Sequence, residues 1–235
     1  MFFSVVIPTY PPHFKFLKNT LKNIIDSVKF SELVGEIIIA CSEVDNIESF
    51  KSNLIENDKI IINNVNIKCN ASENRNRGWN IAKGKYIAFM DADDSYDLNR
   101  FQIMYDIFEK YNCDALIHGF IYFTKYRYTP YIQKQDNNNY LLVNSKTLFK
   151  KTFPDGKWKN FDTNFHIKQP GLTNIACKAA YGHATIKKDI EIRYNETFDQ
   201  GEDAIILREI MYKNKDNGVM FCNKVLSSVN QIFNY

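Results

Sequence analysis

The sequence has no long hydrophobic run, no large excess of charge of one sign and no closely spaced pair of cysteines. Its apolar start, residues 1–7, ends at Pro8 and carries no basic residue, so we expect neither an export signal nor a membrane span there. We therefore expect a cytoplasmic protein with no transmembrane segment, an expectation that is also compatible with a peripheral contact to a membrane.

The formal net charge is only +3, and basic residues alternate with acidic ones instead of forming a stripe. This pattern argues against nucleic acid as a partner. It is compatible with an anionic small substrate, because the charge near a site matters more for such a ligand than the total charge.

The five cysteines are an odd number, and their spacing excludes a zinc knuckle or a redox pair. They are Cys41, Cys69, Cys113, Cys177 and Cys222. Cys41, Cys113 and Cys222 lie among apolar residues and are predicted to be buried thiols in a reducing compartment.

Short apolar runs alternate with segments of helical periodicity through the first half of the chain. We expect strands at 2–7, 36–40, 59–62, 86–90 and 115–123. We expect helices at 14–28, 47–54, 74–82 and 98–108, with Gly84 placed to end the third of these. Such alternation predicts an α/β fold, in which a mostly parallel sheet is flanked by helices.

The second half is less regular. We expect a turn at 136–139 between extended segments, and then an aromatic and basic stretch, 153–171, that is long enough for a functional loop. The expected elements after it are a strand at 184–186, a helix at 202–212 and a strand at 219–225. Since we find no internal repeat and no convincing boundary, we expect a single domain, 1–235.

An acidic cluster, Asp91-Ala92-Asp93-Asp94, comes directly after the expected strand 86–90. Ligands of open α/β sheets bind beyond the carboxyl ends of the strands. Carboxylates crowded there repel one another, so a cation is a natural way to stabilise them, and their hard oxygens suit Mg²⁺ or Mn²⁺. The alternative is that Asp93, Asp94 or Ser95 caps the helix that follows.

Five segments, in the same order as in that family, resemble family 2 glycosyltransferases of the GT-A fold. Residues 75–78 form an Arg-Asn-x-Gly motif, 82–87 an Ala-x-Gly-x-Tyr-Ile motif and 91–93 an Asp-x-Asp motif. The opening Ser-Val-Val-Ile-Pro-Thr-Tyr, 4–10, and the Gly-Glu-Asp at 201–203, followed by Leu207-Arg208, also match. The resemblance runs from Ser4 to about Arg208 and is poor in the middle of the second half.

The resemblance implies a Rossmann-like GT-A domain with a nucleotide-sugar-binding half, 1–125, and an irregular acceptor-binding half, 126–235. In the first half, Pro8, Thr9 and Tyr10 would border the base and ribose, and Arg75 would lie near the nucleotide or its phosphates. The family usually has an acidic pair and Gly-Ser after its second strand, where this chain has Cys-Ser-Glu-Val-Asp, 41–45. Glu43 or Asp45 would then pair with the imide of the base.

The resemblance also implies the roles of the acids. Asp91, with Ala92 beside it, would touch the ribose or sugar, and Asp93, together with Asp91, would hold Mn²⁺ or Mg²⁺ on the diphosphate. Asp203 would be the catalytic base, since an inverting transfer needs a carboxylate to accept the proton of the acceptor hydroxyl. The alternative is that Glu202 and Asp203 are ordinary first-turn acids of a helix.

The implied activity is transfer of a single sugar from a nucleoside-diphosphate sugar, with UDP favoured by family prevalence, to a glycan, lipid-linked or protein acceptor. A polymerising synthase is disfavoured because the Gln-x-x-Arg-Trp segment is absent. A nucleotidyltransferase is disfavoured because no glycine follows the first expected strand. The competing hypothesis is a catalytically inactive, glycosyltransferase-like binding module. It is suggested by segment 41–45, which departs from the family's pattern.

Three further side chains have open roles. His183 is a candidate metal ligand or acceptor contact, but a partly buried histidine bonded to backbone is the more common case. His118 is expected in the core or at a strand edge. Trp158, in the segment 157–161, is either a stacking platform for an acceptor sugar or an anchor of a surface loop.

Overall fold

The structure is a computed structural model that describes residues 1–123, 128–129, 142–144, 183–198, 201–213 and 218–230. Several expected features lie outside the described residues: the turn at 136–139, the loop at 153–171 with its Trp158, and Cys177. In the rest of the chain, a single mixed sheet has the strand order β3-β2-β1-β4-β9-β6-β10-β5.

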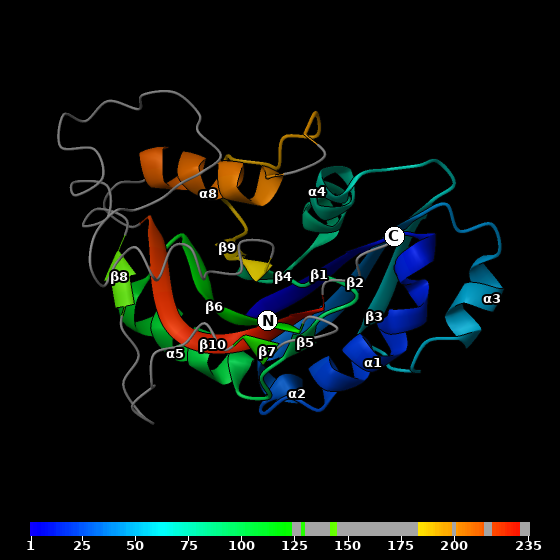
Figure 1. Ribbon diagram of the computed structural model, residues 1–235, viewed down its shortest axis with the longest axis horizontal. Helices are drawn as coiled ribbons and strands as arrows, with labels where there is room; N and C mark the ends of the chain where they lie inside the picture. The colour runs from blue at the N-terminus through cyan, green and yellow to red at the C-terminus, as the bar shows by residue number, and fades with distance from the viewer. Residues whose placement is uncertain (124–127, 130–141, 145–182, 199–200, 214–217, 231–235) are drawn as a thin grey trace.

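Four parallel strands form the first half of this sheet (Figure 1). They are β1 (Phe3–Thr9), β2 (Val34–Ser42), β3 (Ile60–Val65) and β4 (Tyr86–Phe89). Strand β1 pairs with β2 on one side and β4 on the other, and all seven of its residues are buried. Their carboxyl ends therefore lie along one edge, as the strand–helix alternation predicts.

The second half of the sheet is mixed. Strand β9 (Thr185–Lys187) runs antiparallel to both β4 and β6 (Ala115–Phe123). The long β10 (Val219–Asn230) then runs parallel to β6. Three short strands complete it: β5 (Ser95–Tyr96) and β8 (Leu142–Asn144) pair with β10, and β7 (Tyr128–Thr129) pairs with β6.

Helices cover both faces of the sheet (Figure 1). On one side lie η1 (Pro11–His13), α1 (Phe14–Ile25), α2 (Phe30–Leu33), α3 (Ile47–Ser52) and α5 (Arg100–Tyr111). On the other lie α4 (Ala71–Ile81) and α8 (Glu202–Lys213). Since side chains alternate along a strand, Val5 packs toward the first layer and Val6 toward the second, which gives two separate cores.

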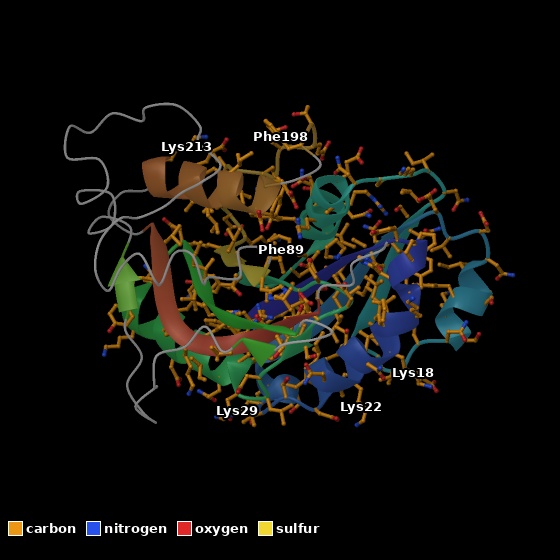
Figure 2. The ribbon with its side chains drawn as sticks, in the orientation of Figure 1. Lys18, Lys22, Lys29, Phe89, Phe198 and Lys213 are labelled. Atoms are coloured by element: carbon orange, nitrogen blue, oxygen red, sulfur yellow. The ribbon has the colours of Figure 1, made fainter. Side chains whose placement is uncertain are left out.

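Figure 2 shows apolar side chains inside these layers and charged side chains on the surface. Phe89 of β4 is fully buried, with its ring centroid 5.5 Å from that of Trp79 of α4. In contrast, Lys18 and Lys22 project from the outer side of α1. Such two-layer burial is typical of a sheet that is covered on both faces.

Two local expectations are wrong. The helix after the acidic cluster begins only at Arg100, with Asn99 at its N-cap, because the chain first forms β5; Asp93, Asp94 and Ser95 therefore do not cap it. Gly84 does not end α4, which stops at Ile81. Its role is close approach, because a Cβ on Gly84 would lie 2.5 Å from the backbone nitrogen of Ser4.

Other expectations are confirmed. Cys41, Cys113 and Cys222 are buried free thiols. His118 is fully buried in β6, with its Nδ1 3.0 Å from the carbonyl of Gly119. None of the helices in the described part of the chain combines the length and apolar character needed to cross a bilayer.

Candidate active site

The acidic cluster forms a tight turn at the carboxyl end of β4. The backbone N–H of Asp94 lies 3.4 Å from the carbonyl of Asp91, which also accepts a 3.0 Å hydrogen bond from the hydroxyl of Tyr96. The hydroxyl of Thr20, on α1, donates to the carbonyl of Ala92 at 2.6 Å. The turn is thus fixed through its backbone, which leaves its carboxylates available for other contacts.

Arg75 of α4 lies between two carboxylates from distant segments. Its Nη2 lies 3.0 Å from Oδ1 of Asp91, and its Nη1 lies 2.6 Å from Oε1 of Glu202, in the first turn of α8. The guanidinium is almost fully buried, whereas 32% of the Asp91 side chain is exposed. Burial favours the neutral form of Asp91, but Arg75 and His183 together outweigh it and hold the pKa of this carboxyl below its usual value.

His183 is held by side chains, so the expectation of a histidine bonded to backbone is wrong. Its Nε2 lies 2.7 Å from Oδ2 of Asp94 and 3.6 Å from Oδ2 of Asp91. Its Nδ1 lies 2.8 Å from the hydroxyl of Ser227 in β10. Burial lowers the pKa of the imidazole, but the two carboxylates outweigh burial and raise it to about 8.

One group of three side chains is arranged so that it could hold a metal ion. Ligand atoms of Asp91, Asp94 and His183 all lie within 4.8 Å of one another. This set shares Asp91 with the predicted pair Asp91 and Asp93 but does not include Asp93. Burial, followed by the neighbouring carboxylates of Asp94 and Asp91, raises the pKa of Asp93 to about 6. A cation would relieve the part of this effect that comes from repulsion between the carboxylates.

Arg100 is buried beneath this site and stabilises its backbone. The sequence did not predict this role. The Arg100 side chain is fully buried, and Nη2 donates to the carbonyls of Phe89, at 3.3 Å, and His183, at 2.8 Å. Burial lowers the pKa of the guanidinium to about 10. Arg100 thus ties the end of β4 to the segment that carries His183, a contact between residues 83 positions apart that no local pattern signals.

The predicted nucleoside-binding residues lie at the neighbouring strand ends. Pro8 and Thr9 end β1 and are buried, whereas Tyr10 is 39% exposed, with its ring centroid 4.4 Å from that of His13. Glu43 follows β2, is exposed and has a positive φ of 59°. Because β1 lies between β2 and β4, Tyr10 and Glu43 share the edge at which Asp91 follows β4.

Asp203 is the second residue of α8 and is partly exposed. It follows Glu202, the partner of Arg75, so α8 places it beside the ion-paired cluster. Its negative charge contributes to raising the pKa of Arg75 against the opposing effect of burial. The position at a helix start is confirmed; the role of Asp203 as a base stays a prediction, as do the ligand roles of Asp91 and Asp93.

Comparisons with known proteins agree on the family. A family model described as glycosyl transferase family 2 matches residues 4–181. A curated relative, the minor teichoic acid biosynthesis protein GgaA of Bacillus subtilis (strain 168), is 31% identical over 118 residues, which are 48% of this chain and 25% of that protein. The match thus spans about a quarter of the length of this relative.

Solved structures share the fold. Crystal structures of S. aureus TarS 1-349 with UDP and with UDP-GlcNAc align over 98% of this chain, with TM-scores of 0.64 and 0.61 and identities of 15% and 14%. The alignments cover 60% and 59% of those chains. With the family model matching most of its length, this chain belongs to glycosyltransferase family 2 and has the GT-A type of α/β fold.

Proposed function

We propose that this chain is an inverting hexosyltransferase that moves a single sugar from a nucleoside-diphosphate sugar, with UDP favoured, to an acceptor hydroxyl. The observation that carries the proposal is the Arg75 cluster, which places Asp91 and the first turn of α8, with Asp203, at one edge of the sheet. UDP is favoured because the TarS structures with this fold hold UDP and UDP-GlcNAc.

In this reaction the acceptor oxygen attacks the anomeric carbon from the face opposite the diphosphate. Asp203 accepts the hydroxyl proton as the new C–O bond forms, and the bond to the diphosphate breaks with its electron pair on the leaving oxygen. The N-terminal end of α8 favours the ionised form of this carboxylate. Asp91, held by Arg75, orients the ribose or sugar of the donor.

The residues at the turn fit a divalent cation, Mn²⁺ or Mg²⁺. Hard carboxylate oxygens converge there, and burial together with the carboxylates of Asp94 and Asp91 raises the pKa of Asp93. Asp93 and Asp91 would hold the ion, with His183 and Asp94 adjacent. Such an ion, when bound, stabilises the negative charge of the departing diphosphate.

The acceptor class is open among glycan, lipid-linked sugar and protein. GgaA is described as a protein of minor teichoic acid biosynthesis, so a teichoic acid is the first acceptor to test.

Donor hydrolysis tests the proposal without an acceptor. The chain is incubated with UDP-glucose, UDP-galactose and UDP-GlcNAc in Mn²⁺, and release of UDP and the anomer of the freed sugar are measured. We expect slow, metal-dependent release, with a β sugar from an α-linked donor, and loss of release in Asp203→Asn. Asp189→Asn, an exposed acid after β9, is the matched control. Binding of UDP without any hydrolysis or transfer would favour the inactive binding module.

A further inference from the structure

Arg77, on helix α4, bonds to residues near the carboxyl ends of two strands, β2 and β3. Its Nη1 donates to the carbonyl of Cys41 at 3.2 Å, and its Nη2 donates to the carbonyl and side-chain oxygen of Asn63 at 2.6 and 2.7 Å. Cys41 lies at the end of β2, and Asn63 lies near the end of β3. The guanidinium is a rigid fork with five donors, which suits bridging of this kind.

Arg77 also fixes the orientation of Asn74, one helical turn before it. Nη1 donates to Oδ1 of Asn74 at 2.6 Å. Since a guanidinium can only donate, the oxygen of the Asn74 amide must face Arg77, and its NH₂ group must face the other way. There it lies 3.3 Å from the carbonyl of Thr9 and 3.4 Å from the hydroxyl of Ser42.

The two side chains together therefore connect the carboxyl ends of β1, β2 and β3. We call these three ends, 9–10, 41–43 and 63–65, the nucleoside edge. The exposed Tyr10 and Glu43 project from this edge, and the backbone N–H of Glu43 donates to the carbonyl of Val65 at 2.9 Å. Glu43 has a positive φ, a conformation that a non-glycine residue keeps only where its surroundings hold it.

We propose that Arg77, acting through Asn74, is a positioning residue for recognition of the donor nucleoside: it holds the nucleoside edge in the spacing that Tyr10 and Glu43 need to contact the base. The inference rests on the proposed function for its ligand. Arg77 donates to four neutral oxygens of the protein itself. This distinguishes it from Arg75, whose partners are the carboxylates of Asp91 and Glu202.

The test compares Arg77→Met with Arg193→Met. Arg193 is a matched control because its guanidinium also donates to backbone carbonyls and also contacts α4, but its partners are the carbonyls of Ile190 and Ile192 and the ring of Trp79, not the strand ends of the nucleoside edge. Binding of uridine and UDP is measured by calorimetry, and KM and kcat are measured for UDP-sugar hydrolysis. In Arg77→Met we expect uridine and UDP binding to weaken by about 10-fold to 100-fold, as loss of charge-assisted hydrogen bonds implies.

The KM-against-kcat split distinguishes positioning from general damage. KM should rise by a similar factor while kcat stays near the wild-type value, because Arg77 bonds to the strand ends and Asn74, whereas it is Arg75 that pairs with Asp91 and Glu202. Unchanged uridine binding in Arg77→Met overturns the inference, and so does an equal fall in kcat. If Arg77→Met does not fold, Arg77→Lys replaces it, since one ammonium cannot bridge both strand ends and should give a smaller loss of the same kind.

Hydrogen exchange makes the inference independent of the proposed function. In Arg77→Met without ligand, the amides of 41–44 and 63–65 should exchange faster, while those of 3–7 stay protected; Arg193→Met should change neither. If the wild type binds no nucleotide, the proposed function fails, and exchange alone then decides whether Arg77 holds the edge. Unchanged exchange at 41–44 overturns the inference whatever the ligand.

Discussion

Asp93 and Asp94 are neighbours in the chain but have different surroundings. Asp94 is buried and bonded to His183, whereas Asp93 is partly exposed. Asp94→Ala should therefore lower the free energy of unfolding by about 3–5 kcal/mol, because it removes the nearer of the two carboxylates that pair with the buried His183. Asp93→Ala should leave unfolding nearly unchanged but abolish metal-dependent binding of the donor. Urea unfolding and calorimetry on both variants check this; equal loss of stability would contradict it.

Glu202 is expected to act through Arg75 and α8 instead of on the substrate. Its side chain is 11% exposed and lies 2.6 Å from the Arg75 guanidinium. Glu202→Gln keeps the shape but removes the charge, so α8 and Asp203 should be held less firmly. We expect kcat for donor hydrolysis to fall by about 10-fold, the loss of roughly one charge-assisted bond, with UDP affinity nearly unchanged.

Glu209→Gln on the same helix is the control for Glu202→Gln, because Glu209 lies two turns further along α8. Steady-state kinetics and UDP titration are compared for the two variants. A loss of UDP affinity in Glu202→Gln as large as the loss of kcat would show that Glu202 binds the donor instead of positioning the base.

At the residue scale, the sequence predicts the acids that stand in motifs but not their partners. Asp91, Asp93 and Asp203 follow or begin expected elements, so their neighbourhood could be inferred. Ser227 could not, because it reaches His183 through the pairing of β10 with β6 and with β5. A two-residue strand such as β5 has no hydrophobic periodicity that would reveal it.

At the element scale, the junction of α4 and β4 is packed against β1 without space for a side chain. Gly84 donates its N–H to the hydroxyl of Ser4 at 2.7 Å, and a Cβ there would collide with the backbone of β1. Gly84→Ala should lower the free energy of unfolding by about 1–3 kcal/mol, the usual cost of overpacking. Lys83→Ala, at an exposed position beside it, should change stability by about 0.5 kcal/mol or less. Thermal unfolding of the pair decides; equal stabilities would contradict this packing.

Element order in the first half was predictable because each strand there is a compact apolar run between helical patterns. Strand β6 has the predicted bounds, whereas β10 extends five residues beyond its predicted end at Val225, through polar positions such as Ser227 and Ser228. Polar residues on a strand that enters a buried polar cluster do not follow the alternation by which strands are found. Tertiary pairing sets these boundaries.

At the scale of the whole molecule, the fold follows from simple rules of α/β sheets, and so does the place of the site. Parallel strands with helices on both faces bring their carboxyl ends together, which places Thr9, Glu43 and Asp91 along one edge. The mixed second half could not be predicted in the same way, because β9 and β10 enter the sheet beside strands that lie far away in the sequence.

The central claim is that this edge binds a nucleoside diphosphate together with a metal ion. The most direct test is calorimetric titration of the chain with UDP, GDP and dTDP, each with and without Mn²⁺. The account predicts that UDP binds tightly and only when Mn²⁺ is present. Absence of binding for all three nucleotides in both conditions would contradict it and would leave the inactive binding module as the better account.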